Sequence, residues 1–335
     1  MNLHKSDIDW CTHTWNPVTG CLHGCEYCYA RRFIGRFQPH ACERPMPNEE
    51  TVLAQKDAPG CYVMWRAVRL VDETGAYVRS TAYPMGFAPT FHTDTLKYPE
   101  NCLTPARIFV SSMGDLFGKW VPENWIEEVF DACKKAPQHT YLFLTKNPGR
   151  YISMAYAGTL PRDKNLWYGS TITAPNMPFF TWEGCNSFLS IEPLLQPLRV
   201  EDMGDGNPFE HIGWVIIGAM TGPGSKKHQP KREWVETIVQ VAREAGAPIF
   251  MKENLRDVWG PDLIQEYPEG MVPDNAKGPA PVPHCKECEH REETPQGKRG
   301  TAIACRIGWH DDGAARPVSG RYSRSSPPWC PKRKE

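Results

Sequence analysis

The sequence lacks any segment that would place the protein in or across a membrane. Its longest apolar stretches, such as residues 214–218, are far shorter than the roughly 20 residues that a transmembrane helix needs. The first residues also lack the apolar core of a signal peptide. We therefore expect a cytoplasmic protein with no membrane partner.

An excess of charge of either sign is missing too. The formal net charge is −1 over 335 residues, which gives no overall attraction to a polyanion. The distribution is uneven, because residues 284–335 carry 11 Lys and Arg against 7 Asp and Glu. This segment therefore has a balance of +4 and the remainder −5. Such a segment is compatible with nucleic-acid contact and equally with a solvated surface.

Cysteine, in contrast, is abundant, with 13 residues. In a long cytosolic chain, clustered cysteines indicate metal binding more than disulfides. The most informative cluster is a C-x3-C-x2-C triplet formed by Cys21, Cys25 and Cys28. It lacks the fourth ligand of a structural zinc site, unless Cys11, His13 or His23 supplies it. A 4Fe–4S cluster accepts the triplet directly, because three irons take thiolates and the fourth stays open.

Further blocks of sequence accompany the triplet. Tyr27 stands directly before its last cysteine, and other blocks lie at residues 108–117, 136–148, 189–195 and 214–224. Together they resemble a phage-associated branch of the radical S-adenosylmethionine (SAM) superfamily, long catalogued as a family of unknown function. The resemblance spans about residues 8–253 and leaves out residues 38–95 and the tail.

The resemblance implies an enzyme that holds a 4Fe–4S cluster on the triplet. It would cleave SAM reductively to a 5′-deoxyadenosyl radical, which abstracts hydrogen from a substrate. An electron donor such as flavodoxin or ferredoxin would be a partner, and the setting would be a phage-infected or prophage-carrying bacterial cell. The resemblance also implies that Tyr27 lies against the adenine of SAM, and we expect His23 to neighbour the cluster without ligating it.

The middle of the chain alternates short apolar runs with amphipathic segments, which is typical of βα units around a parallel sheet. Helices are expected from Pro122 onward and over about residues 231–245. We expect an α/β fold: a partial (β/α) TIM-like barrel with a β-hairpin insertion and a small Cys-rich C-terminal module. The expected boundaries are 1–265 for the barrel with its insertion at about 38–95, 266–283 for a linker and 284–335 for the module. The expected strands cover residues 107–112, 140–145, 166–172, 187–191, 214–217 and 248–251.

In such barrels the chemistry gathers at the C-terminal ends of the strands. Asp115 follows the strand that ends at Ser112, and by its position it is expected to bind the methionine amino group of SAM, although the usual Gly-Gly-Glu is here Met-Gly-Asp. Ser170 and Glu192 are candidates for ribose or substrate contacts. Each of the three serves equally well as a helix cap or a loop hydrogen bonder.

Two more strand ends carry candidates. Lys146 follows the strand that ends at Thr145 and is a candidate for substrate binding. Gly218 opens a glycine-rich segment that fails the phosphate-loop pattern. It would let the backbone approach SAM, and a plain turn is the alternative.

A second cysteine group lies in the tail and comprises Cys285, Cys288, Cys305 and Cys330. Four thiols suffice for a closed zinc site or for a second, fully ligated 4Fe–4S cluster. The uneven spacing leaves both metals open.

The insertion reads as a hairpin of residues 62–71 and 76–81. Its Arg66 and Arg69 alternate with aromatic residues, an arrangement that can stack bases and neutralise phosphate. A surface hairpin without this role fits equally.

Three functions follow. The favoured one is a radical SAM isomerase, lyase or other base-modifying enzyme. It would act on a nucleobase or modified thymidine in phage DNA, in rearrangement, hypermodification or repair, and the target base would be flipped out of the duplex. The second is a radical SAM enzyme that modifies a peptide or protein. The third is a non-catalytic zinc-binding nucleic-acid adaptor.

Overall fold

The computed structural model divides into two units, Met1–Ala276 and Lys277–Glu335, which are described separately. Within the described residues, no helix is long and apolar enough to cross a bilayer. The described residues are 3–37, 52–54, 63–66, 70–71, 77–78, 83, 87–198, 207–222, 224–271, 291–295, 301–309 and 315–318.

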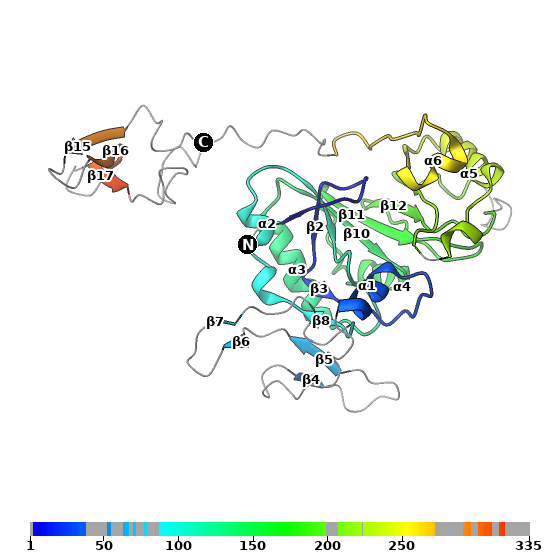
Figure 1. Ribbon diagram of the computed structural model, residues 1–335, viewed down its shortest axis with the longest axis horizontal. Coiled ribbons are helices and arrows are strands. Elements are labelled where there is room, and N and C mark those ends of the chain that lie inside the picture. Colours follow the sequence, from blue (N-terminus) through cyan, green and yellow to red (C-terminus); the bar gives the residue numbers. More distant parts are fainter. Residues whose placement is uncertain are drawn as a thin grey trace. The chain divides into compact units, whose positions relative to one another are not determined.

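The first unit is built on an eight-stranded sheet in the order β1-β2-β9-β10-β11-β12-β13-β14 (Figure 1). The edge strand β1 is antiparallel to β2, and every other neighbouring pair is parallel. The predicted α/β fold with a partial (β/α) barrel is therefore confirmed. The strands are β1 (His4–Lys5), β2 (His13–Trp15), β9 (Arg107–Val110), β10 (Thr140–Thr145), β11 (Leu166–Thr171), β12 (Asn186–Ile191), β13 (Trp214–Ile217) and β14 (Ile249–Met251).

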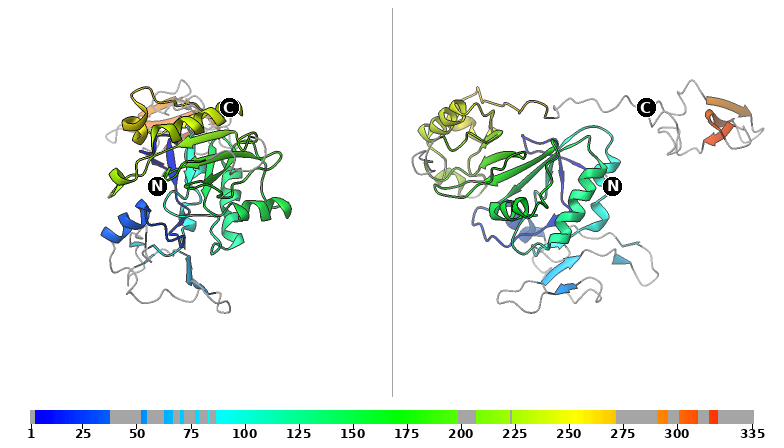
Figure 2. Two further views of the ribbon diagram at one scale, coloured as in Figure 1. Left: turned by 90° about the vertical axis from the view of Figure 1, so that its right-hand side faces the viewer. Right: turned by 180° about the vertical axis from the view of Figure 1, so that it is seen from behind.

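Both faces of this sheet are buried, as its continuous apolar strands predict. On one face lies α3 (Glu123–Lys135) (Figure 2). It starts next to Pro122, as predicted, and buries Trp125, Val129 and Phe130 among others. The other face carries a cluster of aromatic and aliphatic side chains that includes Trp10 and Phe109. The remaining α-helices are α1 (Tyr29–Phe37), α2 (Tyr98–Asn101), α4 (Pro148–Tyr156), α5 (Arg232–Glu244) and α6 (Arg256–Trp259).

The insertion contributes short strands. A second sheet has the order β3-β8-β5-β4, formed by β3 (Val18–Thr19), β8 (Thr90–Phe91), β5 (Val63–Arg66) and β4 (Val52–Ala54). β6 (Leu70–Val71) and β7 (Tyr77–Val78) pair antiparallel, so the predicted hairpin is present. The segment predicted as one strand over 62–71 is two strands with different partners. Arg69 lies outside the described residues, and only the backbone of Arg66 is described.

The second unit contains a three-stranded antiparallel sheet of β15 (Arg291–Pro295), β16 (Thr301–Trp309) and β17 (Ala315–Val318). The backbone of Cys305 lies in β16, opposite Arg291 and Arg316. Cys285, Cys288 and Cys330 lie outside the described residues. The predicted second metal site therefore stays a prediction.

Candidate active site

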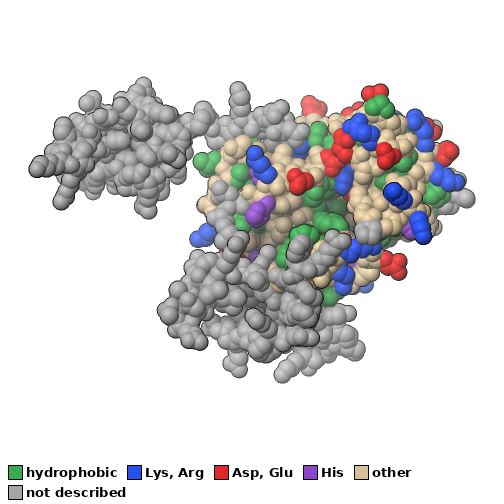
Figure 3. Space-filling view, viewed as in Figure 1, with side chains coloured by type: hydrophobic (Ala, Val, Ile, Leu, Met, Phe, Trp, Pro, Cys, Tyr) green, Lys and Arg blue, Asp and Glu red, His purple; other side chains and the backbone are tan. Residues whose placement is uncertain are grey.

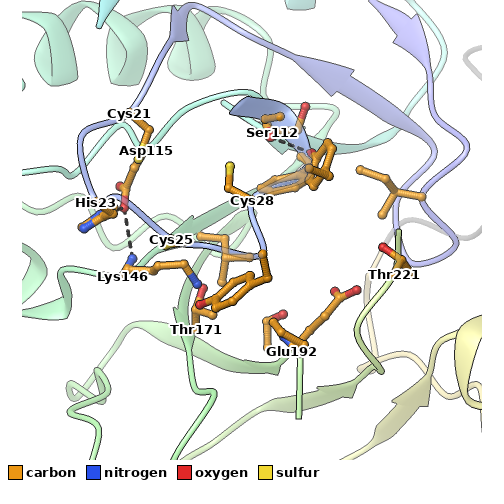
Figure 4. A pocket seen from close by; sticks show the side chains of 18 of the residues that line it. Cys21, His23, Cys25, Cys28, Ser112, Asp115, Lys146, Thr171, Glu192 and Thr221 are labelled. Atoms are coloured by element: carbon orange, nitrogen blue, oxygen red, sulfur yellow. Dashed lines mark hydrogen bonds and ion pairs between the residues drawn. The ribbon is translucent and has the colours of Figure 1, made fainter. Parts of the chain in front are cut away.

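A cavity of about 380 Å³ opens where the parallel strands end at their carboxyl termini (Figure 4). One part of its wall is the loop that carries Cys21, Cys25 and Cys28, called the cysteine loop below. The rest comes from the ends of six neighbouring strands. In βα barrels this edge of the sheet carries the active site. The strand-end residues that line it are Ser112, Gly114 and Asp115 after β9, Leu144–Lys146 at β10, Thr171 of β11, Ser190 and Glu192 at β12, Ala219–Thr221 after β13, and Lys252 after β14.

The three thiols of Cys21, Cys25 and Cys28 all line this cavity, and none is in a disulfide. α1 begins at Tyr29, immediately after the last cysteine, and the Cys28 amide donates to the Cys25 carbonyl at 3.2 Å. Burial, followed by the nearby charges of Asp115 and the other two cysteines, raises the pKa of Cys21 to about 12. Its thiolate therefore needs a cation such as a metal beside it.

The cysteine loop is fastened to the end of β9 through the backbone. The Gly20 amide donates to the Met113 carbonyl at 2.9 Å. Gly20 has φ +82°, and a Cβ there would lie 2.3 Å from the Ala88 carbonyl oxygen, so only glycine fits. The Asn16 Oδ1 accepts from the amide of Met113 at 2.9 Å and from the Ser112 hydroxyl at 3.1 Å.

Asp115 connects the loop to the sheet through its side chain. Its buried carboxylate accepts from His23 Nε2 at 2.7 Å and from Thr145 Oγ1 at 2.8 Å. The amides of Phe117 and Lys146 also donate to it, each at 3.0 Å. A carboxylate has roughly four acceptor sites, so a further donor would have to displace one of these groups. The predicted contact with the methionine amino group stays a prediction.

The His23 ring also packs edge-on against Trp120, with 4.8 Å between ring centroids. It therefore lies between the cysteine loop and the segment after β9, beside the triplet. Its bond to Asp115 fixes the ring orientation, as an outer-sphere group in a metal site requires.

Lys146 and Tyr27, both predicted from the sequence, meet in the cavity. The Lys146 Nζ lies 5.3 Å from the centroid of the Tyr27 ring. Burial lowers the pKa of Lys146, while the nearby Cys25 and Asp115 act in the opposite direction. Burial also raises the pKa of Tyr27 to about 12. The ring and the ammonium form one wall of the cavity near the triplet.

Glu192 pairs with a residue that the sequence analysis missed. Its Oε1 lies 2.6 Å from Lys252 Nζ, and both side chains line the cavity. Lys252 directly follows β14, so the same strand-end rule that selected Lys146 could have selected it. Gly218 makes room for the pair, because a Cβ there would lie 3.0 Å from the Cδ atoms of both side chains. Gly218 itself does not line the cavity.

Ser170 faces away from the cavity. Its buried hydroxyl accepts a hydrogen bond from the Phe180 amide at 3.0 Å, so it serves a backbone group. The neighbouring Thr171 lines the cavity instead, because successive side chains of a strand point to opposite faces. The sequence analysis selected the right strand end but the wrong face.

The donor set around the cavity suits a cluster. Thiolates that ligate an iron–sulfur cluster bind separate irons, so they surround a cavity instead of meeting at one point. Cys21, Cys25 and Cys28 line the same cavity and do not converge on a single point, which is compatible with that arrangement. Within the described part of the chain, no group of three or more His, Cys, Asp and Glu side chains is arranged to hold a metal ion.

Comparisons with known proteins give one family. A family described as "Protein of unknown function (DUF5131)" matches residues 5–267. No curated protein matches the chain. A solved structure of a spore photoproduct lyase mutant with bound AdoMet and dinucleoside spore photoproduct is 8% identical and has a TM-score of 0.35, with 91% of this chain and 71% of that chain covered. A TM-score this low does not establish a common fold.

The first prediction concerns Asp115. We expect Asp115→Asn to lower the free energy of unfolding by about 1.5–3 kcal/mol, because it removes the charge that several buried donors share. Asp131→Asn, on the exposed side of α3, should change it by less than about 0.5 kcal/mol. Urea unfolding measures both, and equal effects would contradict the role given to Asp115.

The second prediction concerns His92, which holds β3 ahead of the cysteine loop. His92 Nε2 lies 2.8 Å from Thr19 Oγ1, and burial lowers the pKa of His92 from 6.5 to about 4. As the pH falls, the unfolded state therefore takes up the proton on His92 before the folded state does. The stability that the protein has with a neutral, buried His92 is complete above pH 6.5 and declines toward pH 4. The loss should reach about 3 kcal/mol.

His92→Gln should flatten this pH dependence, because glutamine does not titrate. His211→Gln, at an exposed position, should follow the original protein. Urea unfolding between pH 7 and pH 4 gives the comparison. Parallel curves for the protein and His92→Gln would show that burial of His92 does not govern the acid response.

Proposed function

The chain belongs to the DUF5131 family, and on that premise we propose that it is a radical SAM enzyme, which cleaves SAM reductively and abstracts hydrogen from a substrate. One observation carries the proposal: Cys21, Cys25 and Cys28 line a single cavity at the carboxyl edge of a parallel sheet. A triplet of thiols leaves one iron of a 4Fe–4S cluster without a protein ligand. Tyr27 and Glu192 line the same cavity as the three thiols that would hold the cluster.

A reduced cluster held by Cys21, Cys25 and Cys28 would supply the electron for reductive cleavage of SAM, and with it the capacity to abstract hydrogen from a substrate. The chain's own residues orient the reactants. The Asp115–His23 bond fixes the cysteine loop. Lys146 places a positive charge beside thiolates that burial otherwise disfavours.

The cavity wall divides by polarity. Apolar side chains, among them Ile8, Trp10, Phe87 and Leu144, keep water away from a reactive intermediate. The Glu192–Lys252 pair offers both signs of charge on the walls formed by β12 and β14. Such a pair can bind ribose hydroxyls through the carboxylate and an anionic group through the ammonium.

The substrate in this proposal is a nucleobase or modified thymidine in DNA, which the enzyme rearranges, hypermodifies or repairs. Support comes from the basic composition of residues 284–335 and from exposed cations beside the cavity. An enzyme that acts on a base takes it out of the stack into a pocket. The second metal site, on Cys285, Cys288, Cys305 and Cys330, is part of the proposal and holds a second 4Fe–4S cluster or zinc.

The third prediction tests the catalytic site. Cys25→Ala should abolish the site's cluster and the formation of 5′-deoxyadenosine after anaerobic reconstitution with iron, sulfide, dithionite and SAM. Iron and sulfide analysis with chromatography of the nucleoside products measures both. Retention of 5′-deoxyadenosine formation in this variant would contradict the assignment.

Two controls accompany it. Cys185→Ala removes a half-buried thiol that does not line the cavity, so product formation should persist. Cys288→Ala should leave the first cluster in place, although the total iron falls if the tail holds a second cluster. Loss of 5′-deoxyadenosine in the Cys185 variant would show that the assay reports general damage by cysteine substitution.

A further inference from the structure

Two aromatic side chains on α1 lead away from the cavity. Tyr29 lines the cavity and is 54% exposed, and Phe33 is 52% exposed. Residues four apart lie on one face of a helix, so the two rings form a stripe that starts at the mouth. They are two of the four large hydrophobic side chains that are exposed among the described residues. Of these four, Tyr29 alone lines the cavity, and Phe33 follows it one helical turn later.

Positive charges accompany this stripe. Arg31 and Arg32 are exposed, and both guanidinium groups are anchored on the cysteine loop. Arg31 donates to the Cys21 carbonyl at 2.8 Å, and Arg32 donates to the Glu26 carbonyl at 2.6 Å. Anchored guanidinium groups lose less conformational freedom when they bind an anion. The carboxylate of Glu26 is the acidic group in this stretch, and it too is exposed.

The loop after β13 meets α1 at the mouth. Met220 and Thr221 line the cavity, and a Cβ built on Gly222 would lie 3.7 Å from an Arg32 guanidinium nitrogen. The segment that follows contains η5 (Ser225–Lys227) and has no acidic residue from 219 to 232. Its exposed basic side chains are Lys226, Lys227, His228, Lys231 and Arg232.

The surrounding surface carries both signs of charge. Glu233 is exposed directly after the basic segment, and Glu236 is paired with Arg232 at 2.8 Å. Figure 3 shows a hollow lined by hydrophobic side chains, with Lys and Arg and also Asp and Glu side chains around it. The basic residues of this surface are therefore concentrated in α1 and in the segment after β13.

We propose that α1, residues 220–222 and residues 224–231 form a docking surface for single-stranded DNA, in which Tyr29 and Phe33 stack bases while Lys226, Lys227 and Lys231 contact phosphates. This inference rests on the proposed function and names the form of its substrate. Aromatic rings interleaved with cations are the signature of single-strand binding, whereas an acidic peptide needs only the cations. A single strand also presents its target base without the cost of opening a duplex.

The test replaces the loop charges. In the triple variant Lys226→Gln, Lys227→Gln and Lys231→Gln, the dependence of log Kd on log salt should become shallower by about 2, since each single-strand phosphate contact contributes about 0.7. The probe is a fluorescein-labelled single-stranded DNA followed by anisotropy over a range of salt. The matched control removes three exposed lysines elsewhere, with Lys134→Gln, Lys135→Gln and Lys164→Gln, and should keep the original slope.

The stacking contribution is tested separately. Phe33→Ala should weaken binding at least about fivefold at every salt concentration, because base stacking on an aromatic ring contributes beyond charge. Tyr156→Ala, at a 78% exposed position on α4, should bind as the original protein does. Equal binding of Phe33→Ala and Tyr156→Ala would overturn the stacking role.

The outcomes distinguish failure of the docking surface from failure of the proposed function. Formation of 5′-deoxyadenosine without DNA should be unchanged in the triple lysine variant. Cleavage of SAM together with equal salt slopes for the triple variant and its control would overturn the docking surface and leave the function intact. DNA binding with the expected slopes, but no cleavage of SAM by the original protein or any variant, would overturn the proposed function and leave the docking surface intact. Tighter binding of duplex DNA, RNA or a polyglutamate peptide would overturn the choice of single-stranded DNA.

Discussion

The buried carboxylate of Asp115 is the interaction on which the cysteine loop depends. An ionised carboxylate is stable away from water only when hydrogen-bond donors surround it. Here the donors come from the loop through His23, from the end of β10 through Thr145 and Lys146, and from Phe117. The demand of one anion for partners therefore joins three segments distant in sequence. Without it the loop would lose this connection and keep others, among them the bonds from the Gly20 amide to the Met113 carbonyl and from the Cys21 amide to the Phe87 carbonyl.

The same sheet edge distributes charge around the cavity. Lys146 lies on the side of the triplet, beside Tyr27, and the Glu192–Lys252 pair lies at the ends of β12 and β14. In the proposed function, the first group compensates the charge of thiolates, and the pair orients polar parts of SAM or substrate. Thr171 and Ser190 line the cavity between these groups, and apolar side chains such as Trp10 and Leu144 complete the wall. In the proposed function, the apolar part of the wall keeps water from the reactive species.

Much of the fold follows from the sequence, because continuous apolar runs and a single amphipathic period specify buried strands and α3 locally. The cavity wall could be predicted as well, because the triplet and the residues after the strand ends are local features of the sequence. The direction of individual side chains was harder to predict. Ser170 and Thr171 differ only in the face of β11 on which they lie, and that face is set by the register of the strand in the sheet. Partners distant in sequence leave no local signal either, as in the Glu192–Lys252 pair and the separate partners of β5 and β6.

The central claim is that the triplet holds a four-iron cluster with one iron open to SAM. Mössbauer spectroscopy of the full chain, reconstituted with iron-57 without oxygen, tests it directly. Adding SAM should change the signal of one iron of a cluster and leave its other three unchanged, whereas a fully ligated cluster in the tail would not respond. A spectrum that SAM leaves unaltered, or a triplet occupied by zinc alone, would contradict the account.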